Sequence, residues 1–137
     1  MSQVRVPRCV TVDIPCTGNV MHHLTPLSDL HMENAVFPRR EFTDFMHARN
    51  KLPNHRSVII GDAVDLVVPV DQKRYRKSVG KNSTRDDWAN EAVEAATEIL
   101  EDTCTPFDMI CPGNHEDEFL KRHGYDATSI LAYNMKA

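Results

Sequence analysis

The chain has 137 residues, with 16 Lys and Arg against 20 Asp and Glu, so its formal net charge is -4 at pH 7. Hydrophobic residues make up 41% of it and charged residues 26%. These proportions are typical of a globular domain, and they exclude a disordered acidic chain and a collagen-like repeat. The mild acidity also argues against a protein that binds nucleic acid over its whole surface, although a local basic patch is compatible with it.

Three further features concern the compartment. Charged residues interrupt the apolar positions of residues 1–14, which is not the pattern of a signal peptide. No stretch approaches the ~20 consecutive apolar residues of a membrane-spanning helix. The four cysteines include no Cys-x-x-Cys pair, so free thiols are expected. We therefore predict a cytoplasmic protein without a membrane partner.

The first half of the chain alternates between apolar and polar stretches. Phe42, Phe45 and Met46 recur at helical spacing and predict one apolar helix face, with Pro38 suited to its first turn. Pro26 weakens the end of the strand in which it falls. The predicted elements are an edge strand or extended arm at 4–14, a strand at 20–27, a loop at 28–34, a helix at 37–52 and a strand at 57–60.

The second half continues the alternation. A capping-box spacing at Ser83 or Thr84 precedes a long apolar-faced helix, and Gly124 is placed to end a shorter one. The predicted elements are a basic loop at 71–82, a helix ending near 102, a strand at 107–111, a helix at 117–123 and a helix from 128. Alternating strands and helices predict an α/β fold, in which a mostly parallel sheet is flanked by helices.

Polar side chains follow three of the predicted strands. The blocks are Asp29-Leu30-His31, Gly61-Asp62-Ala63-Val64-Asp65 and Gly113-Asn114-His115-Glu116. Ligands of parallel sheets bind at the carboxyl ends of the strands, where these blocks fall. Mixed carboxylate and imidazole donors suit Mn, Fe, Zn or Co, and a pair of such ions can hydrolyse phosphate esters.

In this order, the three blocks resemble the first signature motifs of the calcineurin-like metallophosphoesterases, and residues 73–76 and 123–126 resemble phage and bacterial members in particular. The resemblance covers about residues 21–133, so we divide the chain into an N-terminal extension, 1–20, and the N-terminal portion of a metallophosphoesterase domain, 21–137. It implies a partial βαβ sandwich that hydrolyses phosphate mono- or diesters with two divalent metal ions. The implied metal ligands are Asp29, His31, Asp62 and Asn114, the implied catalytic residue is His115, and the supporting residues are Asp65 and Glu116.

The chain also departs from the family. Its members continue with a later strand-borne histidine and a Gly-His-x-His motif, whereas the one histidine after His115 is His123. The resemblance therefore implies an enzyme whose remaining ligands come from a missing C-terminal half or another chain, including a second copy. The alternative is a catalytically incomplete module that binds a metal or nucleic acid.

Expectations also follow for the basic run, for His55 and for two of the cysteines. The basic run that contains Arg74 and Arg76 is either a solvated loop or a contact for the phosphate of a substrate such as a nucleotide or nucleic acid. His55 is expected in a polar turn. Cys104 and Cys111 flank a predicted strand and are expected to be buried thiols.

Overall fold

The computed structural model describes residues 13, 18–66 and 88–137. Apart from residue 13, the predicted arm at 4–14 lies outside these residues, and so do the basic loop with Arg74 and Arg76 and the helix cap at Ser83 or Thr84. The elements in chain order are β1 (His23–Leu27), α1 (Arg39–Asn50), β2 (His55–Ile59), α3 (Trp88–Asp102), β3 (Phe107–Ile110), α4 (Asn114–His123) and α5 (Ala127–Met135).

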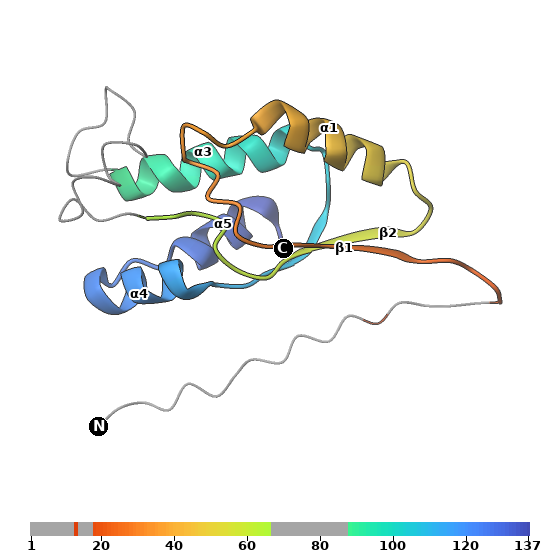
Figure 1. The fold of residues 1–137 in the computed structure, drawn as a ribbon. Coiled ribbons are helices and arrows are strands. Elements are labelled where there is room, and N and C mark those ends of the chain that lie inside the picture. Colours follow the sequence, from red (N-terminus) through yellow and green to blue (C-terminus); the bar gives the residue numbers. More distant parts are fainter. Residues whose placement is uncertain (1–12, 14–17, 67–87) are drawn as a thin grey trace.

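The three strands form one sheet in the order β1-β2-β3, and both pairs are parallel. Helices α1 and α3 occur in the connections between consecutive strands, as parallel neighbours require. Both helices lie on the same side of the sheet (Figure 1). The predicted α/β fold with a parallel sheet and flanking helices is therefore confirmed. None of the helices in the described parts of the chain is long and apolar enough to cross a membrane.

The edge position of β1 accommodates its proline. Pro26 pairs in register with Val58 of β2, and β1 has a neighbour on one side only within the described sheet. A residue without an N–H is tolerated there, because an edge strand can turn that position away from its partner. The strand predicted at 20–27 thus exists, but it begins at His23.

The core lies between the sheet and the helices. Met46 of α1, Ile59 of β2, Leu100 of α3 and Leu131 of α5 are among its most completely buried side chains. The prediction that Phe45 shares the buried face of α1 is wrong, because this side chain is 47% exposed. Consecutive side chains of a helix point about 100° apart, so a helix that buries Met46 turns the side chain of Phe45 towards solvent.

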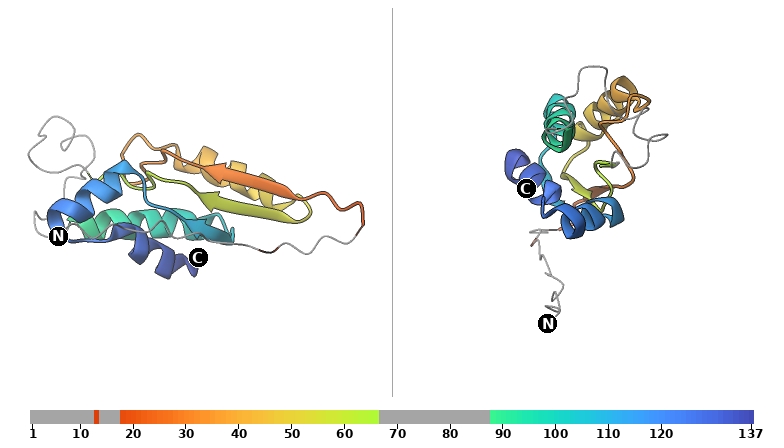
Figure 2. Two further views of the ribbon diagram at one scale, coloured as in Figure 1. Left: turned by 90° about the horizontal axis from the view of Figure 1, so that it is seen from below. Right: turned by 90° about the vertical axis from the view of Figure 1, so that its left-hand side faces the viewer.

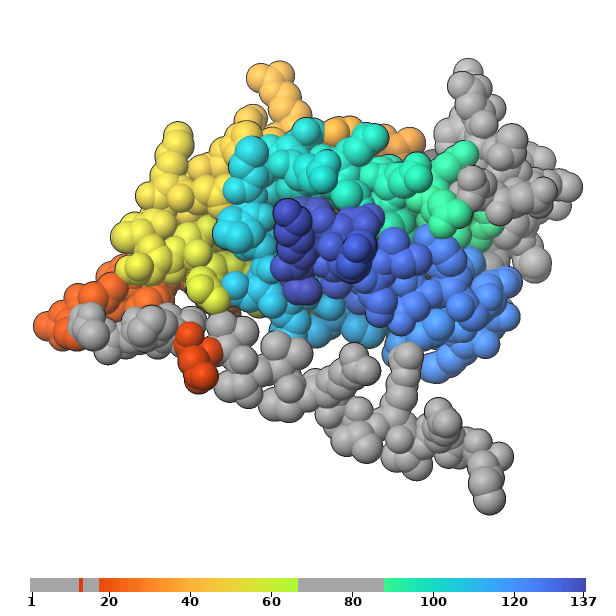
Figure 3. Space-filling view, turned by 180° about the vertical axis from the view of Figure 1, so that it is seen from behind, coloured from red at the N-terminus to blue at the C-terminus, as the bar shows by residue number. Residues whose placement is uncertain are grey.

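Helix α5 packs against α3 and against β3. Seen from behind, it lies across the middle of that face, with α3 above it and α4 to one side (Figure 3). Its first turn is capped by Asp126, whose carboxylate accepts a hydrogen bond from the Ser129 amide at 3.0 Å. The right-hand view of Figure 2 shows α1 and α3 on one side of the strands and α4 on the other.

Two sequence expectations need correction here. His55 is the first residue of β2 rather than part of a turn, and its Nε2 lies 2.8 Å from the Thr25 hydroxyl of β1. Burial lowers the pKa of His55, and the positive Arg49 and neighbouring His23 lower it further. Cys104, which takes a left-handed conformation (φ 52°) after the end of α3, is exposed rather than buried, and Cys111 is half-buried.

Candidate functional site

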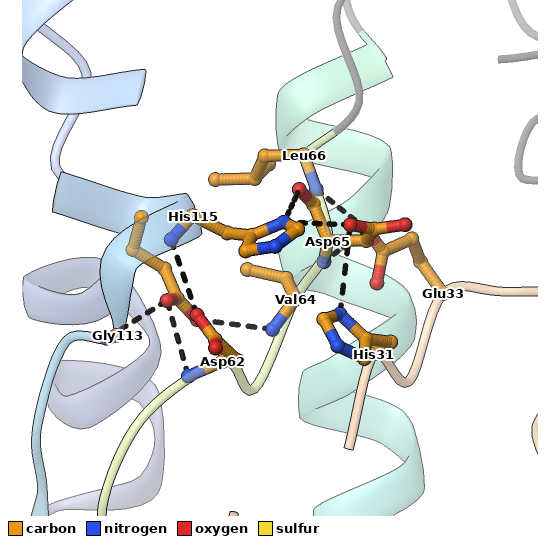
Figure 4. A network of polar contacts seen from close by, with 9 residues as sticks. His31, Glu33, Asp62, Val64, Asp65, Leu66, Gly113 and His115 are labelled. Carbon is orange, nitrogen blue, oxygen red and sulfur yellow. Dashed lines mark hydrogen bonds and ion pairs between the residues drawn. The ribbon is translucent and has the colours of Figure 1, made fainter. Parts of the chain in front are cut away.

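Three loops meet where the strands end. The segment 29–33 follows β1, the segment 61–66 follows β2, and the segment 111–113 joins β3 to α4, whose first turn carries His115. Figure 4 shows side chains from all three loops gathered at this edge, with His31, Asp65 and His115 facing one another. The carboxyl edge of a parallel sheet is where ligands bind in this class of fold.

Backbone hydrogen bonds join the first two loops. The Asp29 amide donates to the Gly61 carbonyl at 3.2 Å, and the amides of Leu30 and His31 both donate to the Asp62 carbonyl, at 2.9 and 3.1 Å. Asp29, His31 and Asp62 all adopt left-handed conformations, with φ of 53°, 47° and 51°. Such conformations are unfavourable for non-glycine residues and persist where surrounding contacts impose them. The bonded loops therefore hold these side chains in set directions.

Two glycines bring the second and third loops into contact. A Cβ on Gly61 would lie 2.9 Å from the Cα of Gly113, and Gly61 has φ +129°, which other residues rarely adopt. A Cβ on Gly113 would lie 2.1 Å from Oδ1 of Asp62 and 2.3 Å from its amide nitrogen. Neither position has room for a side chain, so both glycines are required for this close approach.

Glu116 connects the same two loops from the first turn of α4. Its Oε2 accepts hydrogen bonds from the Gly113 amide (2.9 Å) and the Asp62 amide (3.2 Å), and its Oε1 accepts one from the Val64 amide (3.1 Å). The side chain is 3% exposed. Glu116 thus caps α4, which begins at Asn114 and not at the predicted residue 117, and it also fixes the loop after β2.

His115 lies against Asp65. Its Nδ1 is 2.7 Å from the Asp65 carboxylate and 2.9 Å from the Asp65 carbonyl oxygen. Because both neighbours are acceptors, Nδ1 carries the proton and Nε2 is the ring nitrogen left for a ligand or substrate. The Nδ1 of His31 is 3.6 Å from the same carboxylate, and the two imidazole rings meet edge to face with centroids 5.1 Å apart.

The other predicted ligands lie around this group. Asp62 is 8% exposed, and its Oδ1 accepts a hydrogen bond from the His115 amide at 3.1 Å. Asp29 is exposed, and its carboxylate accepts a hydrogen bond from the Ser28 hydroxyl. Asn114 is the exposed first residue of α4. Apart from Arg74 and Arg76 of the basic loop, the predicted site residues therefore all lie at this edge, although only some of them contact one another.

Glu33 is a further residue of this edge that the sequence motifs do not include. Its Oε1 accepts hydrogen bonds from the amides of Asp65 (2.6 Å) and Leu66 (2.9 Å). Burial raises the pKa of its carboxyl group, an effect that these amides oppose and the negative Asp65 reinforces. No spacing rule indicates this contact, because it joins positions more than 30 residues apart.

One group of potential metal ligands lies at this edge. Among the described residues, His31, Asp65 and His115 are the one group of three potential ligands whose donor atoms all lie within 4.8 Å of one another. The Nδ1 of His31 is buried there and makes no hydrogen bond to any of the residues that the structure describes. An imidazole nitrogen in that state, beside a carboxylate and a second imidazole, suits a transition-metal ion. Within residues 18–66 and 88–137, Asp29 and Asp62 belong to no such group.

Comparison with known proteins adds no relative. No family model, no curated protein and no solved structure matches the chain.

Proposed function

We propose that the chain is a metal-dependent phosphoesterase, a hydrolase of phosphate mono- or diesters that uses a dinuclear metal site. The observation that carries this proposal is the pairing of His115 with Asp65 at an edge where the loops after all three strands meet. A histidine oriented by a carboxylate is suited to proton transfer, and clustered carboxylate and imidazole donors are suited to metal binding.

Each residue has a role in this proposal. Asp29, His31, Asp62 and Asn114 would be the residues that hold the two metal ions. Manganese, iron, zinc or cobalt, when bound, supplies positive charge beside the phosphate and activates water. When both ring nitrogens of His115 carry a proton, the ring would deliver the Nε2 proton to the leaving oxygen of the ester and would keep the Nδ1 proton, which Asp65 holds together with the orientation of the ring.

The three-stranded sheet is, in this proposal, one part of a larger metallophosphoesterase sandwich. The two-ion site needs more imidazole ligands than the described edge provides. A further segment of a longer protein, a separate chain or a second copy supplies them. Arg74 and Arg76 contact the substrate phosphate, and the substrate class includes nucleotides and nucleic acids.

The test is hydrolysis of p-nitrophenyl phosphate and of its bis ester by the natural full-length gene product with Mn²⁺, Co²⁺ or Zn²⁺. Asp62→Asn and His115→Ala should each lower kcat by at least about 100-fold, since each removes a group used in the reaction itself. Glu118→Ala is the matched control, because Glu118 is exposed and pairs with Arg122 on α4. Unchanged hydrolysis in both site variants would contradict the proposal.

A second candidate function is favoured by the group of His31, Asp65 and His115. The chain is then a module that binds a single divalent ion without turnover, consistent with a donor set for one ion. Titration calorimetry with Mn²⁺ or Zn²⁺ distinguishes the candidates. One site that is lost in His31→Ala and retained in Asp62→Asn supports the module, whereas two tight sites, both weakened by Asp62→Asn, support the phosphoesterase.

A further inference from the structure

The carboxylate of Glu33 binds the backbone of the loop after β2, beside His115. Glu33 is two residues beyond His31, and its Oε1 accepts hydrogen bonds from two consecutive amides, those of Asp65 and Leu66. Figure 4 shows it next to Asp65 on the side opposite His115. One carboxylate oxygen thus fixes the peptide at the point where Asp65 faces the histidine.

The loop after β2 is held by two carboxylates that divide its amides between them. Glu116 accepts from the amides of Asp62 and Val64, and Glu33 accepts from those of Asp65 and Leu66. The loop is therefore attached to α4 at its start and to the segment after β1 at its end. Buried amides without an acceptor are costly, so loss of either carboxylate should shift the part of the loop that it holds.

The part that Glu33 holds is the part that orients His115. Both acceptors of the His115 Nδ1 proton, the carboxylate and the carbonyl oxygen, belong to Asp65. Their positions depend on the backbone of residue 65 and on the turn at Leu66, which has φ 47°. A change of about 1 Å in this backbone is enough to break hydrogen bonds of 2.7 and 2.9 Å.

We propose that Glu33 is a positioning residue, which acts through the backbone of Asp65 to keep His115 in its Nδ1-protonated tautomer with Nε2 facing the site. The importance of this tautomer for turnover rests on the proposed phosphoesterase function, whereas the tautomer itself does not. The second oxygen of Glu33, Oε2, is buried and has no hydrogen-bond partner in the described parts of the chain. Glutamine should therefore replace Glu33 well, because its carbonyl can accept both amides and its NH₂ group displaces no existing bond.

The direct test is the tautomer of His115, measured by long-range ¹H–¹⁵N NMR on the metal-free protein at a pH where the ring is neutral. Wild type and Glu33→Gln should show the Nδ1-protonated form. Glu33→Ala should show a mixture with the Nε2-protonated form. If Glu33→Ala does not fold, Glu33→Asp gives the same test, since its shorter side chain cannot reach both amides. Glu118→Ala is the control for loss of a glutamate.

Hydrolysis provides an independent second readout. Glu33→Ala should lower kcat by about 10-fold with little change in KM, as expected for loss of a group that orients a reacting side chain, and Glu33→Gln should restore it. An unchanged tautomer in the Ala or Asp variant, or a Gln variant that behaves like Ala, would overturn the proposal. A wild-type protein without turnover would count against the phosphoesterase function alone, because the NMR comparison would still decide the role of Glu33.

Discussion

Removal of the Glu116 side chain should be the most destabilising single change at the candidate site. Glu116 is 3% exposed and accepts hydrogen bonds from three backbone amides, those of Asp62, Val64 and Gly113. In Glu116→Ala these amides lose their acceptor while they remain largely buried. Each unsatisfied buried amide costs roughly 1–3 kcal/mol, and water that enters the vacated space recovers part of this cost. We expect a loss of about 3–5 kcal/mol.

Urea unfolding followed by circular dichroism measures this loss. With an m value of roughly 1.5 kcal/mol/M, a loss of ~3 kcal/mol lowers the midpoint by about 2 M. Glu116→Gln should lie between Ala and wild type, because its single carbonyl oxygen can replace Oε2 or Oε1 but not both. Glu118→Ala, which removes an exposed ion pair to Arg122, should change stability by less than about 1 kcal/mol. A loss below about 1 kcal/mol in Glu116→Ala would refute the reasoning, since these amides would then not depend on the carboxylate.

Three other changes test the packing, a titration and the metal site. Gly113→Ala should destabilise the fold by about 2 kcal/mol or more, because the added Cβ would meet Asp62 although the φ of -94° suits any residue. In Gly18→Ala the added Cβ meets none of the residues that the structure describes, so the cost should be only the roughly 1 kcal/mol of its positive φ. Urea midpoints of the two variants check this. Folding lowers the pKa of His55 from its ordinary value of 6.5, so the stability that His55 contributes is fully present above pH 6.5 and is lost as the pH falls towards the lowered pKa. The wild-type protein should therefore lose stability over this pH window, and His55→Gln should lose less. Urea unfolding at a series of pH values measures both. His31→Ala should weaken Zn²⁺ binding in calorimetry, and an unchanged affinity would exclude His31 as a ligand.

The fold was largely predictable from sequence because its signals are local. The apolar spacing of α1 and the short β-branched run of β2 are readable within a few residues, and so is Gly124, which takes φ +70° at the end of α4. The boundaries were less accurate. His55 belongs to β2 because it pairs with His23 of β1, and this pairing joins distant parts of the chain.

The candidate site was predictable as a set of motifs and not as a set of contacts. The order of strands and polar blocks correctly indicates that residues 29–31, 61–65 and 113–116 meet at one edge, because parallel strands end on the same side. The sequence could not indicate that His31 lies beside Asp65 and His115, or that Glu33 holds the backbone of residue 65. Those contacts depend on left-handed turns and on amides that find acceptors more than 30 residues away.

The most direct test of the proposed activity is the Mn²⁺-dependent rate of p-nitrophenyl phosphate hydrolysis by the natural full-length protein and by Asp62→Asn, compared at equal folded fractions. The substitution keeps the shape of the side chain and its Oδ1, which accepts the His115 amide, and removes the negative charge that two metal ions would share. We predict turnover that depends on the metal and falls at least about 100-fold in the variant. Equal rates in the two proteins, or no hydrolysis by the metal-loaded wild type, would contradict a dinuclear phosphoesterase site.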